Sequence, residues 1–158
     1  MTERAGTPPV VVRAARPADA DVLITFNAVM AFETERKQLD ITTLTRGIDA
    51  VLQDASRGRY LVAEVDGRVA GALLLTLEWS DWRDGWFWWI QSVYVVREVR
   101  RRGVFRALHA AVLEQARAAG DVVGVRLYVE DRNAIAQRTY AALGMSPAGY
   151  RVYETLAL

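Results

Sequence analysis

The sequence predicts a single α+β domain, in which a mostly antiparallel mixed sheet carries helices on both faces. Short apolar runs and longer segments with helical spacing follow one another in the order β-α-α-β-β-β-α-β-α-β. An Asp-Gly pair at 66–67 separates two apolar runs, which is a strong signal for a two-residue hairpin turn. Residues 86–96 are apolar at both parities, as expected of a strand covered on both sides.

The first half of the chain supplies a strand and two helices. Residues 1–9 lack periodicity and are expected to form a loose tail before a domain that spans 10–158. Residues 10–15 form a short strand that Pro17 ends. Apolar residues at helical spacing then predict a helix within 17–35 and a second one over about 42–54.

The middle of the chain supplies three strands. Two of them flank Asp66-Gly67 within residues 59–79, and a second Asp-Gly pair at 84–85 precedes the strand over 86–96. Strict alternation along that last strand would place one set of side chains on one face, namely Trp86, Trp88, Ile90, Ser92 and Tyr94. The remaining residues, Phe87, Trp89, Gln91, Val93 and Val95, would then occupy the other face.

The last third of the chain continues with a helix over 103–119, which Gly120 closes as a C-terminal cap. A strand over 122–130 and a helix over 133–144 follow. The chain is predicted to finish in a strand over 150–158. The sequence contains no internal repeat and no linker, so one domain accounts for all of it.

Composition excludes several classes of function. The 158 residues contain no cysteine and one histidine, His109, so thiolate or histidine-rich metal sites and a cysteine nucleophile are excluded and no metal is expected. The net charge of +1 argues against a nucleic-acid-binding protein. No apolar run approaches the length of a membrane span or resembles a signal peptide, so we expect a soluble cytoplasmic protein.

Positive charge is concentrated in "VREVRRRGVFRALHA", residues 96–110, where a helix begins. A helix start leaves backbone N–H groups without partners, and a Ser, Thr, Asp or Asn side chain normally accepts from them. This sequence offers Arg100, Arg101, Arg102 and Gly103 instead. A bound anion would complete such an end. The alternative is a plain glycine cap with its arginines in water.

Two segments resemble the GNAT N-acetyltransferase superfamily. Residues 93–113 resemble its pyrophosphate-binding motif, [Q/R]-x-x-G-x-[G/A], with Arg100 and Gly103 at the first two defined positions. Phe105 departs from the glycine or alanine of the third position, so its side chain would have to point away from the cofactor. Residues 127–145 resemble the following segment and end in Leu-Gly-Met. The residues of that segment that match are Asn133, Ala136 and Tyr140.

The resemblance implies acetyl-CoA as co-substrate, with its pyrophosphate held by loop amides and an oxyanion donor in the backbone around residues 93–95. The cofactor-binding residues implied are Val93, Val95, Arg100, Arg101, Arg102, Gly103, Val104, Phe105, Arg106, Asn133 and Ala136. Tyr140 would be the general acid, because a phenol with a pKa of about 10 can protonate a departing thiolate. Its alternative is a half-buried core tyrosine.

The catalytic base and the acceptor site are less defined. Glu33 and Glu78 are candidate bases, although an acid in either position is more often a solvated surface residue. Phe32 and Glu33 end the first helix, in the region that shapes the acceptor site of the family, and Gln91 on the central strand could relay water. Tryptophans interleaved with acids suit an amine through cation–π attraction; the substrate-binding candidates among them are Trp79 and Trp82.

The sequence is therefore interpreted as an N-acetyltransferase that moves an acetyl group from acetyl-CoA to an amine, with a small molecule as the favoured acceptor and direct attack as the route. A protein amine stays open as acceptor, and the resemblance allows a homodimer. The alternative is a catalytically weak acyl-CoA-binding regulatory module, for which the departure at Phe105 is the main support.

Overall fold

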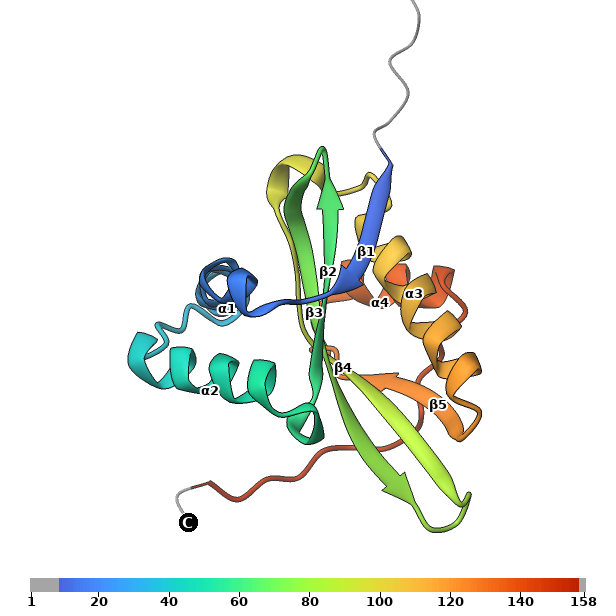
Figure 1. The fold of residues 1–158 in the computed structure, drawn as a ribbon. Helices are drawn as coiled ribbons and strands as arrows, with labels where there is room; N and C mark the ends of the chain where they lie inside the picture. Colours follow the sequence, from blue (N-terminus) through green and yellow to red (C-terminus); the bar gives the residue numbers. More distant parts are fainter. Residues whose placement is uncertain (1–8, 157–158) are drawn as a thin grey trace, which may run out of the picture. The chain divides into compact units, whose positions relative to one another are not determined.

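The computed structural model describes residues 9–156, so the predicted tail lies almost wholly outside the described residues. The chain forms two compact units, one that ends at Tyr128 and one over Val129–Leu158. The first unit begins with strand β1 (Val10–Ala14) and helices α1 (Ala20–Glu35) and α2 (Ile41–Gln53). The remaining elements of this unit are β2 (Arg59–Val65), β3 (Arg68–Ser80), β4 (Gly85–Val95), α3 (Val104–Ala119) and β5 (Val122–Leu127). Figure 1 shows their arrangement.

The five strands form one mixed sheet in the order β1-β2-β3-β4-β5. The first three pairings are antiparallel and the β4–β5 pairing is parallel, which confirms the predicted mostly antiparallel mixed sheet. Asp66 and Gly67 form the β2–β3 turn with φ angles of 52° and 71°, the left-handed conformation that a two-residue hairpin turn requires.

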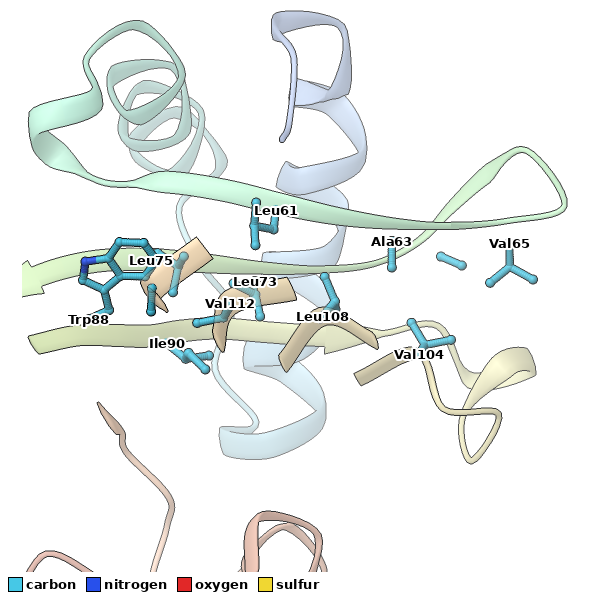
Figure 2. Close-up of a cluster of buried hydrophobic side chains, with 12 residues drawn as sticks. Leu61, Ala63, Val65, Leu73, Leu75, Trp88, Ile90, Val104, Leu108 and Val112 are labelled. Carbon is cyan, nitrogen blue, oxygen red and sulfur yellow. The ribbon is translucent and has the colours of Figure 1, made fainter. Parts of the chain in front are cut away.

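Helices cover both faces of this sheet. Helix α3 packs on one face, where Val104, Leu108 and Val112 contact side chains of β2, β3 and β4 (Figure 2). Helices α1 and α2 pack on the other face, where Leu23 and Ile48 belong to a second buried cluster. Figure 1 shows α1 and α2 on one side of the strands and α3 on the other, as predicted. The interior of the sheet is therefore shielded from water on both sides.

Strand β4 contains a bulge that corrects the predicted alternation. Ala72 pairs with Tyr94 and Leu74 with Gln91, which leaves Leu73 opposite both Ser92 and Val93. Ser92 takes a left-handed φ of 51°. The extra residue reverses the parity beyond Gln91, because a bulge inserts one residue into only one of two paired strands. The predicted grouping of Tyr94 with the β4 side chains before the bulge is therefore wrong.

The faces of β4 follow from this bulge. Val93 and Val95 pack with Trp88 and Ile90 in the α3 cluster, whereas Tyr94 packs in the α1–α2 cluster. Side chains alternate between the two faces on either side of the bulge, but the bulge exchanges the faces on which even- and odd-numbered residues lie. The bulge places an aromatic ring beside α1 where strict alternation would have placed a valine.

The second unit contains helix α4 (Ala134–Ala142), and the predicted helix over 133–144 is confirmed. The Asn133 side chain accepts from the Ala136 amide at 3.0 Å, as an N-cap does. The predicted last strand is wrong for its described part, since residues 150–156 form no strand. An apolar alternation becomes a strand only where a neighbouring strand supplies hydrogen bonds. Residues 157–158 lie outside the described part.

Candidate functional site

The turn between β4 and α3 is open at its glycine. Gly103 is the N-cap of α3 with a φ of 81°, and as a glycine it supplies no side chain to accept a hydrogen bond from the helix start. A Cβ placed on Gly103 would meet no atom within 4 Å. Arg101 is also left-handed, with a φ of 67°. Successive amides in such conformations form an anion-binding concavity, and the helix dipole adds partial positive charge. The turn can therefore accept an anionic group.

The start of α3 is held rigidly against the sheet. Val104 is buried at the first helical position, and Leu108 follows one turn later. A Cβ on Gly71 of β3 would come within 2.9 Å of the Val104 side chain, so this strand approaches the helix start closely. The Phe105 ring lies 6.1 Å from the ring of His109, one turn further along α3. Burial lowers the pKa of His109, which keeps that imidazole neutral near pH 7.

Strand β4 loses its β5 partner before it reaches the turn. The parallel pairing extends from Trp86–Val122 to Ile90–Leu127, and no described strand pairs with residues 91–95 on that side. The Val96 amide donates to Ala70 of β3, so by alternation the peptide groups of Val93 and Val95 face the open edge. These are the two residues whose amides the sequence analysis proposed near the thioester.

The Glu33 carboxylate joins α1 to the turn between β4 and α3, which is called the cofactor turn below because the resemblance predicts the cofactor there. Arg97 Nε donates to one Glu33 oxygen at 2.8 Å, and Arg100 Nη2 donates to the other at 2.8 Å. Arg100 Nε also donates to the Val95 carbonyl at 2.8 Å. These contacts lower the pKa of Glu33, chiefly through the Arg100 hydrogen bond and then through Arg97. The carboxylate is therefore ionised at neutral pH and only weakly basic.

A groove of about 380 Å³ lies beside this ion-pair cluster, between α1 and the end of β4. It contains the predicted Phe32 and Glu33 together with residues that were not singled out from the sequence. The lining residues are Thr25, Phe26, Val29, Phe32, Glu33, Tyr94, Val96, Arg97 and Glu98. Spacing along α1 could have indicated Phe26 and Val29, because they recur at helical intervals before Phe32. Only the bulge brings Tyr94 to this face.

The hairpin tryptophans lie far from this groove. Trp79 and Trp82 are at the opposite end of β4 from the turn, and the 11 residues of this strand separate the two ends by about 35 Å. Their side chains are exposed. Figure 1 shows the β3–β4 hairpin and the start of α3 at opposite ends of the strand. Within one chain the structure does not bring these predicted acceptor residues to the cofactor turn.

The other two polar candidates on the sheet are engaged locally. Glu78 accepts from Trp89 Nε1 at 2.8 Å and from Arg126 at 3.1 Å, on the hairpin half of the sheet. The Gln91 amide donates to the Thr76 hydroxyl at 2.5 Å, directly before the bulge. Gln91 therefore lies next to the open edge of β4, whereas Glu78 lies well away from it.

The remaining candidates belong to the second unit. Tyr140 lies two turns along α4 from the Asn133 cap, and burial raises the pKa of its phenol. The phenol is therefore protonated at neutral pH, as a proton donor must be. The roles of Asn133, Ala136 and Tyr140 toward a cofactor stay predictions.

Two searches of the described part concern other kinds of site. Within residues 9–156, no three His, Asp or Glu side chains cluster in a way that could hold a metal ion. None of the helices in the same part is both long and apolar enough to cross a membrane.

Comparison with known proteins agrees with the fold. The profile of the acetyltransferase (GNAT) family matches residues 27–145. A solved structure described as a possible acetyltransferase from Clostridium difficile 630 is 42% identical, with a TM-score of 0.88 over 94% of this chain and 98% of that chain. No curated protein sequence matches significantly.

Two more distant structures share the fold. A ribosomal-protein-alanine N-acetyltransferase from Brucella melitensis biovar Abortus 2308 is 17% identical, with a TM-score of 0.76 over 94% of this chain and 99% of that chain. An aminoglycoside N-acetyltransferase in complex with CoA is 16% identical, with a TM-score of 0.79 over 100% of both chains. With the family profile and the 42% identical structure, this evidence establishes that the chain belongs to the GNAT family of acetyltransferases.

Proposed function

We propose that this protein transfers an acetyl group from acetyl-CoA to the amine of a small molecule by direct attack. The observation that carries the proposal is the open, left-handed turn at Gly103, which adjoins the unpaired edge of β4. A relative of the same fold was solved with CoA bound, which supports acetyl-CoA as the co-substrate here. Residues 10–158 would act as one acyltransferase domain, because the family profile spans both units.

The turn would hold the pyrophosphate of acetyl-CoA. Amides at the start of α3, over residues 103–106, are directed toward the N-terminal end of that helix, where an anion is favoured. The exposed side chains of Arg101 and Arg102 add positive charge beside them. The peptide groups of Val93 and the amide of Val95 would pair with the amides of the pantetheine arm as an added strand would, while the Val95 carbonyl accepts from Arg100.

The transfer itself needs two groups from the protein. The neutral amine attacks the thioester carbonyl carbon, a C–N bond forms, and the carbonyl oxygen gains negative charge that a backbone N–H of residues 93–95 stabilises. The C–S bond then breaks, and Tyr140 donates its proton to the departing thiolate. Burial raises the pKa of Tyr140, which keeps the proton on the phenol until it is needed.

Glu33 is better suited to positioning than to proton abstraction. Both of its oxygens accept from arginines, and its pKa is lowered, so it holds protons poorly. Glu78 is engaged by Trp89 and Arg126 near the hairpin. We therefore propose that the proton of the attacking amine leaves to water, with Gln91 beside the open edge as the polar group that orients it.

Substitution of Tyr140 by Phe tests the proposal. With acetyl-CoA and an accepted amine, Tyr140→Phe should lower kcat by about 10²–10⁴-fold while acetyl-CoA affinity by calorimetry stays within twofold. Tyr153→Phe is the matched control, because Tyr153 is a fully solvated tyrosine of the same unit. An undiminished kcat would remove Tyr140 as the acid. Acetyl-CoA binding without turnover of any amine would instead favour the regulatory-module alternative.

A further inference from the structure

The groove beside the cofactor turn has an aromatic wall. The rings of Phe26 and Tyr94 lie 4.9 Å apart at 43°, and Phe32 is 48% exposed at the end of α1. Val29 and Val96 complete an apolar surface on both sides. Such a wall favours a ligand whose body can leave water, since apolar contact stabilises binding in proportion to the area buried.

A guanidinium group already lies over two of these rings. The Arg100 guanidinium lies 5.5 Å from the centre of the Tyr94 ring, and that of Arg36 lies 5.3 Å from the centre of the Phe32 ring. A ring that already faces a guanidinium attracts a second cation less, because the two positive charges repel each other. The aromatic wall is therefore poorly suited to bind a ligand with several positive charges.

Of the two carboxylates that line the groove, one is in ion pairs and the other is not. Glu33 pairs with both Arg97 and Arg100, so this cluster has one positive charge in excess. Glu98 also lines the groove, is exposed, and has no ion-pair partner among the described residues. The charges of Arg97, Arg100, Glu33 and Glu98 therefore sum to zero, and the exposed Glu98 carboxylate, which has no direct ion pair, can contact one ammonium group on an apolar body. The groove volume of about 380 Å³ is at the small end of the range for ligand pockets.

From these observations we infer that the acceptor is a small monoamine with an apolar body, which Phe32 and its aromatic neighbours contact and which Glu98 attracts. The inference rests on the proposed function and narrows it. Polyamines, aminoglycosides and amino sugars are disfavoured, because their several charges or hydroxyl groups would meet the apolar wall and the arginine-covered rings. An amine that also carries a carboxylate is disfavoured, because that carboxylate would lie near Glu98.

A panel of four amines tests the inference with the full chain and acetyl-CoA, by the initial rate of CoA thiol release. The probes are 2-phenylethylamine, L-phenylalanine, spermidine and glucosamine. We expect kcat/KM for 2-phenylethylamine to exceed that of each other probe by about tenfold or more, which corresponds to about 1.4 kcal/mol. L-phenylalanine differs from 2-phenylethylamine only by its carboxylate and therefore isolates the charge requirement.

Variants connect the preference to the groove. Phe32→Ala should raise KM for 2-phenylethylamine about tenfold with kcat within twofold, whereas Ile41→Ala, which removes a similarly exposed apolar side chain outside the groove, should change neither. Glu98→Gln should raise the same KM several-fold, whereas Glu114→Gln on α3 should leave it unchanged. Equal effects of Phe32→Ala and Ile41→Ala would overturn the inference.

Other outcomes separate the inference from the proposed function. A higher kcat/KM for spermidine, glucosamine or L-phenylalanine than for 2-phenylethylamine would overturn the monoamine inference and leave acetyl transfer intact. If acetyl-CoA binds and no amine is acetylated, the proposed function fails. In that case calorimetry of the four probes with the acetyl-CoA-loaded protein decides the inference, and binding of 2-phenylethylamine no tighter than spermidine would overturn it.

Discussion

The two ends of strand β4 have similar side chains and different backbones. At the hairpin end, β4 pairs with β3 and β5 on both sides, and the Trp79 and Trp86 rings contact edge to face at 4.9 Å. At the other end the strand bulges at Ser92 and continues without a β5 partner into the left-handed turn at Gly103. Figure 1 shows the strand running between these regions.

Acids, arginines and aromatic rings occur at both ends and act differently. Glu78 lies across the outer surface of the sheet between Trp89 and Arg126. Glu33 joins a helix to the cofactor turn and lines a groove. The difference is that no described strand pairs with residues 91–95 on the β5 side of the bulged end, whereas β3 and β5 both pair with the hairpin end. Aromatic and acidic composition therefore does not distinguish the two ends of β4, whereas the backbone pairing does.

The largest effect on acetyl-CoA affinity is expected from Gly103→Glu. It places a carboxylate at the open turn, where it would repel the pyrophosphate and fill the N-terminal end of α3, so acetyl-CoA affinity should fall by at least about a hundredfold. Calorimetric titration with acetyl-CoA measures it. Gly103→Asn is the control, because asparagine tolerates a left-handed φ without adding charge. Equal affinity of Gly103→Glu and wild type would remove the anion site from the turn.

Deletion of Ser92 should have the next largest effect. It removes the bulge and leaves Val93, Tyr94 and Val95 on their present faces, so the core should be kept and the left-handed strain of about 1 kcal/mol relieved. Because the peptide groups at the open edge would move, kcat/KM should fall by about 10²–10³-fold.

Thermal unfolding and acetyl-transfer assays on the deletion separate stability from catalysis. Ser92→Gly, which keeps the bulge and suits its φ, should retain activity within a few-fold. Full activity of the deletion variant would show that the bulge does not orient the reacting groups. The bulge would then not explain why one end of β4 is proposed to take part in acetyl transfer and the other end is not.

Glu33→Gln should give a smaller, pH-dependent effect. The pKa of Glu33 is lowered in the folded protein, so its ion pairs stabilise the fold above its ordinary pKa of about 4.5 and stop doing so as pH falls through the lowered value. The loss at neutral pH should be at most about 1 kcal/mol, because both arginines are partly solvated.

Chemical denaturation of wild type and Glu33→Gln at pH 7 and in acid measures that difference, which should disappear in acid. Activity should fall only a few-fold, and the acidic limb of the pH–kcat/KM profile should keep its position, because Glu33 positions the turn and does not take the proton. Loss of that limb in the variant would identify Glu33 as the base.

The smallest effect is expected from Trp82→Ala. Trp82 is 87% exposed at the hairpin, at the opposite end of β4 from the cofactor turn, so kcat/KM and the melting temperature should both stay near wild type. Steady-state kinetics with the best amine of the panel provides the check. A tenfold rise in KM would place the hairpin in an acceptor site after all, supplied by a second copy of the chain.

The sequence predicted most of the local structure and the site only in part. The elements up to α4 and the Asp66-Gly67 turn follow from periodicity and left-handed φ preferences, and the resemblance correctly indicated the family. The predicted Phe32 and Glu33 do line a groove next to the cofactor turn. The Ser92 bulge and the side to which Tyr94 points were missed, because pairing with β3 decides them.

By itself, the sequence determined which segments up to α4 form helices and strands, and that the turn before α3 has a glycine and no acceptor side chain. These properties depend on the φ preferences and spacing of neighbouring residues. Tertiary structure decided the rest: Glu33 contacts Arg97 and Arg100 across 64 and 67 positions. It also left residues 150–156 without a strand and placed the tryptophans away from the groove. Contacts between distant residues depend on how the sheet pairs, and local spacing does not encode that pairing.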